Sequence, residues 1–111
     1  MIEETILKYL SQKLSVPVSM EVPEKPPAAF CVVEKTGSGR DNRINSATFA
    51  VQSYGSTLYQ AAKLNERVKA EMDDLAELNE IARAELNSDY NYTDSSTKRY
   101  RYQAVYDITH Y

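Results

Sequence analysis

The sequence predicts an α+β protein in which two helices pack on one face of a mainly antiparallel sheet of four or five strands. Three observations support this fold class. Amphipathic helix patterns occupy residues 2–14 and a stretch from Thr57 to about residue 78. Other segments alternate apolar and polar residues, as half-buried strands do. Short links join strands that are neighbours in the sequence, which favours antiparallel pairing.

The first half of the chain predicts one helix and three strands. An apolar residue recurs at every fourth position of the helix: Ile2, Ile6, Leu10 and Leu14. Pro17 prevents the helix from continuing much further. A short strand at 18–22 and a proline-rich loop then lead to the apolar, β-branched segment 28–35, which reads as a well-buried strand. The segment 44–54 alternates apolar and polar residues and predicts a half-buried strand.

The second half predicts a helix followed by two strands. Thr57 and Gln60 match the capping box that begins many helices, and apolar residues spaced at three and four continue to about Leu78. A strand at 81–92, the polar turn TDSST and a strand at 98–111 complete the chain. One face of the last strand is formed by Tyr100, Tyr102, Ala104, Tyr106 and Ile108.

The composition fits one domain that spans residues 1–111 and has no internal disulfide. A chain of 111 residues can bury a core of its own. The single cysteine, Cys31, lies in the apolar stretch AFCVVE and is expected to be a buried, unreactive side chain. The acidic start MIEETILKYL is unlike a signal peptide, and no apolar run is long enough to span a membrane. We therefore expect a soluble protein that is assembled in the cytoplasm.

The segment EKTGSGRDNR, residues 34–43, has the composition of a phosphate-binding loop but not its context. A phosphate cradle needs a helix directly after the glycines, with its N-terminal amides pointing at the anion. Here the glycines lie between two predicted strands, and GSGR lacks the Gly-Lys-Ser/Thr ending of a P-loop. We therefore predict a long β-hairpin arm at about residues 34–44, with glycines at positive φ angles.

Opposite charges on the arm and on the second helix predict a contact between neighbouring copies of the chain. Residues 35–43 carry three bases and one acid, whereas residues 56–80 carry six acids and three bases. Solvated charged faces are common, but a head-to-tail contact between these two surfaces would generate a ring. The candidate interface residues are Lys35, Arg40, Asp41, Asn42, Arg43, Glu66, Glu71, Asp73 and Asp74.

The sequence offers little for catalysis or metal binding. His110, the only histidine, is next to the C-terminus, where a side chain is rarely held rigidly. One cysteine and one histidine are too few for a zinc site. Asp73 and Asp74 lie on the polar face of a helix, where solvation is the usual reason for charge. We expect neither an enzyme nor a cofactor or metal.

The tyrosine-rich end with KRYR is the best case for a nucleic-acid contact. Tyrosines can stack on bases, and Arg99 and Arg101 could reach phosphates. The net charge of −3 argues against such binding. Tyrosines are also good strand formers that cover a sheet face or a protein interface. We favour this second reading, count both arginines as protein-interface candidates, and expect no direct nucleic-acid recognition.

Several stretches of the chain resemble the tail-terminator, or tail-completion, family of long-tailed bacteriophages. They begin with SVPVSMEVPEKPPAAFCVVE and the polar hairpin KTGSGRDNR. They continue through the strand SATFAVQSY and the helix TLYQAAKLNERVKAEMDDL to the closing YNYTDSSTKRYRYQAVYDITHY. The resemblance spans nearly the whole chain and consists of structural patterns, not catalytic signatures. Tyr54 stands where many relatives carry a tryptophan.

The resemblance implies a mechanical function in the virion tail or neck. Such proteins form a ring, typically of six subunits, at the head-proximal end of the tail tube. The ring stops tube growth and presents a surface to the head connector. The implied partners are other copies of the chain, the major tail tube protein and a head connector or neck protein. From the position and charge of the loop, we expect Arg40, Asp41 and Arg43 to contact a neighbour or the tube. The alternatives are a head-completion or neck adaptor protein and, less favoured, a small single-stranded nucleic-acid-binding domain.

Overall fold

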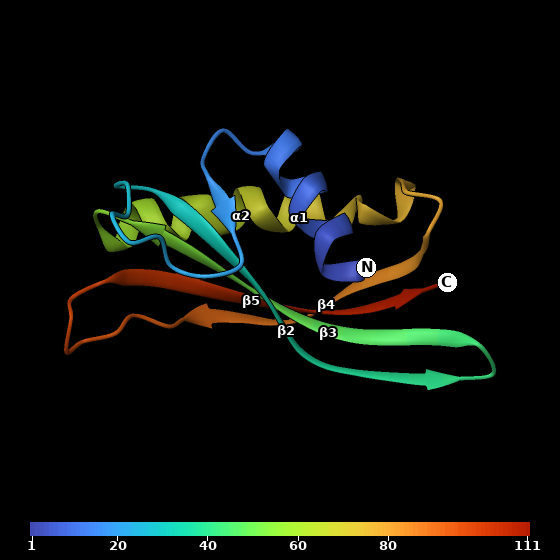
Figure 1. Ribbon diagram of the computed structural model, residues 1–111. Helices are drawn as coiled ribbons and strands as arrows, with labels where there is room; N and C mark the ends of the chain where they lie inside the picture. Colours follow the sequence, from blue (N-terminus) through green and yellow to red (C-terminus); the bar gives the residue numbers. More distant parts are fainter.

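The computed structural model describes all residues, 1–111, and has the predicted α+β fold. Helices α1 (Ile2–Lys13) and α2 (Leu58–Asp73) cover the same face of a five-stranded sheet (Figure 1). A short 3-10 helix, η1 (Leu75–Glu77), follows α2. The strands are β1 (Val18–Ser19), β2 (Phe30–Asp41), β3 (Ile44–Gly55), β4 (Ile81–Asn91) and β5 (Tyr100–His110).

The strand order is β1-β2-β3-β5-β4, so the last strand of the chain lies between β3 and β4. The pairs β2–β3, β3–β5 and β5–β4 are antiparallel. In contrast, β1 runs parallel to β2, because the connection at 20–29 returns the chain to the other end of the sheet before β2 begins. The strand predicted at 18–22 is therefore only two residues long. The Ser19 hydroxyl already donates to the Glu21 carbonyl oxygen in the bend that follows.

The core lies between the helices and the sheet, as the apolar patterns predict. Ile6 and Leu10 of α1 are buried, and Leu14 is buried just beyond the end of this helix. From α2, Val68 and Met72 are fully buried against the sheet. The strands contribute Cys31, Val33, Ala47, Phe49, Val51, Ile81, Ala104, Tyr106 and Ile108.

The second helix begins where the capping box predicts and ends earlier than expected. The Thr57 hydroxyl oxygen accepts a hydrogen bond from the Gln60 backbone N–H at 3.1 Å. The helix ends at Asp73 instead of near residue 78, and Asp74 leaves the helical conformation with a ψ of 6°. This change of direction brings Leu75, at the start of η1, into the core, where it is fully buried.

β2 and β3 extend beyond the helices as a long hairpin arm, which gives the molecule a length of 44 Å against a width of 25 Å (Figure 1). β5 stays paired with β3 as far as Asn45, so only the turn at 41–44 projects past the paired strands. The glycine segment is part of this ladder, since Gly37 and Gly39 both pair with β3. No glycine has a positive φ, so that part of the prediction is wrong. Asn42 and Arg43 make the turn instead, with φ values of 50° and 67°. A two-residue hairpin turn needs positive φ at both positions to match the twist of its strands.

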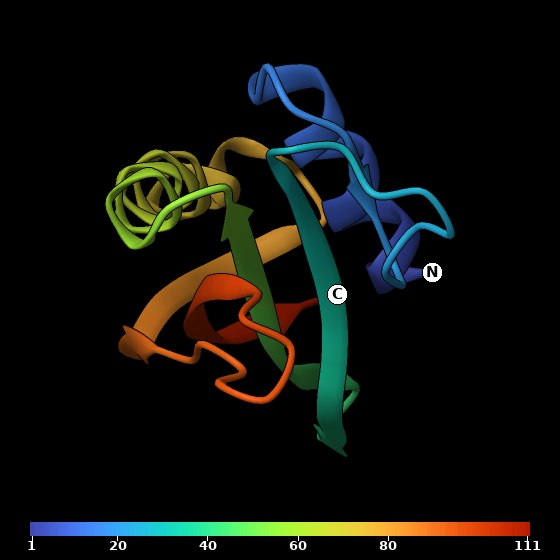
Figure 2. The same ribbon diagram turned by 90° about the vertical axis from the view of Figure 1, so that its left-hand side faces the viewer.

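The two helices lie over different halves of the same sheet face. Viewed along the sheet, α1 lies above the side that carries β2, and α2 lies above the side that carries β4 (Figure 2). In agreement with this view, α1 contacts β1 and β2, whereas α2 contacts β3, β5 and β4. The arm therefore lies toward the β2 edge of the sheet, and α2 lies toward the β4 edge.

The sheet face that is not covered by helices is largely polar. The Gln52 amide donates to the Gln103 side-chain oxygen at 2.6 Å, and Gln103 donates to the Tyr90 hydroxyl at 2.6 Å. Both glutamines are buried, and these bonds give their side-chain amides partners in place of water. Near the start of β2, the rings of Phe30 and Tyr54 stack with centroids 4.3 Å apart.

Candidate assembly interface

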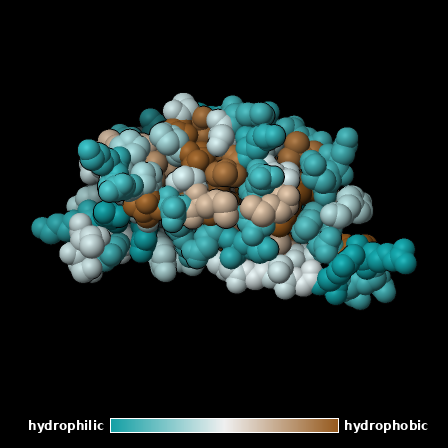
Figure 3. Space-filling model, viewed as in Figure 1, coloured by the Kyte–Doolittle hydropathy of each residue, from teal (hydrophilic) through white to brown (hydrophobic).

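The tip of the arm carries side chains that the fold itself does not use. Arg40, Asp41, Asn42 and Arg43 are exposed, and none of them has an ion pair or a side-chain hydrogen bond within the chain. Ile44 is 46% exposed at the same place. The arm appears as a hydrophilic projection at the lower right of the space-filling view (Figure 3). These residues are therefore available to a partner.

Arg43 occupies a backbone position that favours glycine. Its φ of 67° is left-handed, and a side chain in that region costs about 1 kcal/mol. Asn42, with a φ of 50°, is one of the few residues that tolerate this conformation. The hairpin therefore keeps a positive charge at its outermost position although local backbone energy would favour an Asn-Gly turn.

Lys35 lies at the base of the arm and not at its tip. Its ammonium is 3.2 Å from a carboxylate oxygen of Glu3, and both side chains are partly buried. Glu3 belongs to the first turn of α1, so this ion pair ties the helix to β2. The charge that sequence reasoning assigned to the arm is in this case balanced within the chain.

Two of the predicted acidic residues on α2 form ion pairs along the helix. Glu66 is 2.9 Å from the ammonium of Lys69, and Glu71 is 3.9 Å from the guanidinium of Arg67. Exposed pairs at this spacing contribute only about 0.3–0.5 kcal/mol each. Their carboxylates can therefore exchange their present partners for others at small cost.

Lys69 and Asn65 connect α2 to β4 through one carboxylate. Lys69 lies 2.9 Å from a carboxylate oxygen of Asp89, and the Asn65 amide donates to the same oxygen at 2.8 Å. The hydrogen bond from Lys69, and then that from Asn65, lower the pKa of Asp89 against the opposing effect of partial burial. This network fixes the position of β4 beneath α2.

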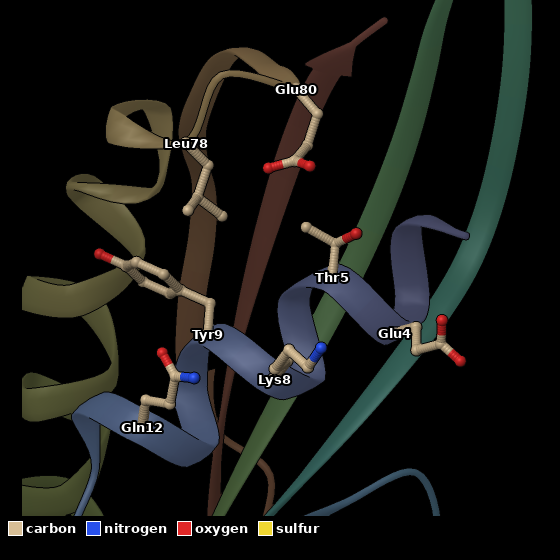
Figure 4. Close-up of a pocket in the computed structure, with 7 residues that line it drawn as sticks. All are labelled: Glu4, Thr5, Lys8, Tyr9, Gln12, Leu78 and Glu80. Atoms are coloured by element: carbon tan, nitrogen blue, oxygen red, sulfur yellow. The ribbon is translucent and has the colours of Figure 1, made fainter.

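Asp73 and Asp74 have different surroundings although they are adjacent. The carboxylate of Asp73 accepts a hydrogen bond from the Tyr106 hydroxyl at 2.9 Å. Burial, and then this bond, raise the pKa of Tyr106, so its hydroxyl stays protonated and holds Asp73 in place. Asp74 is exposed and has no ion pair, as is Glu80 just before β4. Glu80 points over β5 toward α1 (Figure 4), so Asp74 is the free acid at the end of α2.

Arg101 is held inside the chain, whereas Arg99 is free. Arg101 donates to the Tyr92 carbonyl oxygen at 2.7 Å and to the Tyr54 hydroxyl at 2.8 Å. Its guanidinium carbon also lies 4.5 Å from the centre of the Tyr92 ring. Arg99 is exposed, and its side chain forms no hydrogen bond or ion pair. Only one of the two arginines in KRYR is thus available to a partner.

A hollow of about 230 Å³ between α1 and the start of β4 does not assemble a chemical site (Figure 4). The ring of Tyr9 points toward α2, away from Lys8, and Glu80 lies across the hollow. Burial, followed by the nearby carboxylate of Glu77, raises the pKa of Tyr9 to about 12, so its hydroxyl stays neutral. His110 has only the Tyr111 carbonyl oxygen near its Nδ1, at 3.3 Å. No group of three His, Cys, Asp or Glu side chains is placed to hold a metal ion.

Neither helix is long and apolar enough to cross a membrane. No protein-family model matches the chain, and no curated protein matches its sequence. The candidate interface therefore depends on the geometry described above, together with the family resemblance carried by the sequence.

Sequence reasoning missed three features of this interface. It placed the turn at the glycines, although Asn-Arg between two strands of equal length was the available signal for a two-residue turn. It did not single out Ile44, which is 46% exposed beside the arginines of the tip. It also did not recognise the free edges of β2 and β4, because edges follow from strand order, which here depends on the position of β5.

Proposed function

We propose that this protein is a structural protein of a bacteriophage tail. It forms a ring, with six subunits as in the family it resembles, at the head-proximal end of the tail tube. The ring ends tube growth and provides the surface that joins the head. The supporting observation is the arm, an ordered extension on which Arg40, Asp41 and Arg43 have no role in the fold itself.

The distribution of unpaired charge supports a head-to-tail arrangement of the subunits. The free cations Arg40 and Arg43, beside one free acid, Asp41, lie at the tip of the β2–β3 hairpin. The free acid Asp74 lies at the end of α2, the helix over the β4 side of the sheet. A surface that binds a different surface of the next copy generates a closed ring when the rotation between copies closes. The projecting tip of the β2–β3 hairpin thus fits a surface of a second copy of the chain.

The internal contacts of Arg101 reduce the case for the nucleic-acid alternative. A site for single-stranded nucleic acid would need several free cations beside exposed aromatic rings. Arg101 is instead bonded to Tyr54 and Tyr92, and the net charge of the chain is −3. The neck adaptor remains the second candidate, because it would use the same kind of protein interface.

Tail tubes provide the direct test. Tubes of a candidate major tail tube protein are grown with the purified protein and viewed by electron microscopy. We expect a ring at one end of each tube and no further growth there. The double variant Arg40→Glu/Arg43→Glu should leave most ends bare.

The control carries the same change in charge away from the arm. Lys25→Glu/Lys63→Glu reverses two exposed lysines that have no ion pair, so it should cap tubes as the wild type does. Continued growth at saturating wild-type protein would refute the proposal. Capture by the connector protein, with no binding to tubes, would identify the neck adaptor instead.

A further inference from the structure

Two strand edges on opposite sides of the sheet have no partner in the chain. β1 pairs only with Cys31 and Val32, so the edge of β2 from Glu34 to Asp41 is free. β4 pairs only with β5, so its outer edge is free except at Ile81, whose N–H donates to the Leu78 carbonyl oxygen. A free edge presents backbone N–H and C=O groups that a further strand can bond.

The two edges have compatible directions. β2, β3, β5 and β4 alternate in direction across the sheet, so β2 and β4 run opposite to each other. If β4 of a second, similarly oriented copy lay beside β2, the new pair would be antiparallel. The sheet would then continue through both subunits with its alternation intact.

The rows of the sheet place the tip of β2 and the start of β4 at the same level. Arg40 lies opposite Asn45, Asn45 opposite His110, and His110 opposite Ile81. Docking without stagger therefore sets Arg40 of one copy against Ile81 of the next. Glu80 does not join this row, because its side chain points over β5 toward α1 (Figure 4).

A second row brings together two residues whose backbone groups both point outward. Ser38 lies opposite Ala47, which lies opposite Ile108, and Ile108 lies opposite Ala84. In a two-residue hairpin the strand residues next to the turn bond each other, and backbone direction alternates from there. Ser38, three residues before Asp41, therefore directs its N–H and C=O away from β3.

The same alternation applies to β4. The Tyr92 N–H donates to the Arg101 carbonyl oxygen at 2.8 Å, so odd-numbered residues of β5 bond β4. Ile108 consequently faces β3, and its partner Ala84 directs its backbone groups to the free edge. Ser38 and Ala84 of adjoining copies thus form a bonding pair in the docking without stagger.

We propose that subunits join by strand addition, with the free edge of β2 in one copy paired to the free edge of β4 in the next. This inference rests on the proposed ring-forming function and names its contact. Arg40 then lies at the level of Ile81 of the neighbour. The bulges in β4, between Ile81 and Arg83 and between Leu86 and Ser88, keep the pairing short and limit uncontrolled addition of strands.

Proline at each edge tests the pairing because it removes one outward N–H and leaves the bonds within the chain intact. The variants are Ser38→Pro and Ala84→Pro. Their matched controls are Ser38→Val and Ala84→Val, which keep the N–H. Sedimentation up to millimolar concentration reports assembly, and circular dichroism reports folding.

We expect wild type and valine variants to form oligomers larger than dimers. Each proline variant alone should associate at least about tenfold more weakly than the wild type. One hydrogen bond between the strands is lost, and the proline ring obstructs the approaching strand. A mixture of the two should give 1:1 dimers, since each variant retains the edge that the other lacks. Full assembly by either proline variant alone would overturn the inference, as would a wild type that stays monomeric at millimolar concentration.

Amide hydrogen exchange of the wild type gives a second readout that needs no variant. Raising the concentration should slow exchange of the outward amides of Ser38, Arg40 and Ala84 by tenfold or more. Unchanged exchange in an assembled sample would refute strand pairing. If the protein caps tubes while these results are negative, the proposed function stands and only its interface is wrong. If it assembles but does not cap tubes, the proposed function fails instead.

Discussion

Replacing Arg101 by alanine should destabilise the fold, although its neighbour Arg99 should tolerate the same change. Arg101 lies in the β5 segment that approaches Tyr54 and Tyr92, and it donates one hydrogen bond to each of these residues. Its guanidinium also lies over the Tyr92 ring at 4.5 Å. Arg99 makes none of these contacts, so it is a matched control two residues away.

The structure sets the size of the effect. Two hydrogen bonds from a charged donor contribute about 1 kcal/mol each at a half-buried site, and the aromatic contact adds about 0.5–1 kcal/mol. We therefore expect Arg101→Ala to lower the free energy of unfolding by about 2–3 kcal/mol. This is a large fraction of the roughly 5–15 kcal/mol typical of a domain. Arg99→Ala should stay within about 0.5 kcal/mol of the wild type.

Urea unfolding followed by far-ultraviolet circular dichroism measures the free energy of unfolding of both variants. Both are extrapolated to water with the same dependence of free energy on urea concentration. If Arg101→Ala is no more destabilising than Arg99→Ala, the internal role assigned to Arg101 is wrong. Arg101 would then return to the set of residues available to a partner, and the nucleic-acid alternative would regain its second arginine. Arg101→Lys should recover only part of the loss, because an ammonium cannot reproduce both bonds and the stacking.

Three further outcomes are expected. Arg43→Gly should raise the free energy of unfolding by up to about 1 kcal/mol by relieving the left-handed backbone, while weakening ring formation; a loss in thermal stability would contradict this. Asp89→Asn should cost about 0.5–1 kcal/mol at pH 7. The pKa of Asp89 is lowered in the folded protein, so its charged form adds stability above the unfolded value near 4, and this stability is lost as the pH falls through the lowered pKa. The free energies of unfolding of the two proteins, measured by urea titration, should therefore converge at acid pH; a constant difference would exclude this linkage. Cys31 is fully buried, and burial raises the pKa of its thiol to about 12, so a thiol reagent should label it only as fast as the protein unfolds; rapid labelling of the folded protein would show that the site opens locally.

The amphipathic patterns predicted the helices and the buried faces of the strands because burial follows local periodicity. Ile6 and Leu10 on α1, and Phe49 and Val51 on β3, are buried as their spacing indicates. The capping box at Thr57 was equally readable, since it depends on two residues three positions apart. The end of α2 could not be read in this way. The helix ends at Asp73, although the apolar pattern continues to Leu75, which is buried from the following 3-10 helix.

The candidate site was predicted only in outline. Charge and position identified the tip of the arm, where Arg40 and Arg43 lie free in solvent. The same criteria grouped Lys35 and Arg101 with them, although one pairs with Glu3 and the other is enclosed by tyrosines. Such partners lie far along the chain, so the sequence carried no local signal for them.

The sequence by itself determined the class of fold, the faces of its helices and strands, and the presence of a charged hairpin. These features depend on the order of apolar and polar residues over a few turns or a few strand positions. Only the tertiary structure decided the strand order, in which β5 separates β3 from β4 and leaves β2 and β4 as opposite edges. It also decided which charges are free, because an ion pair depends on the distance between segments that folding brings together.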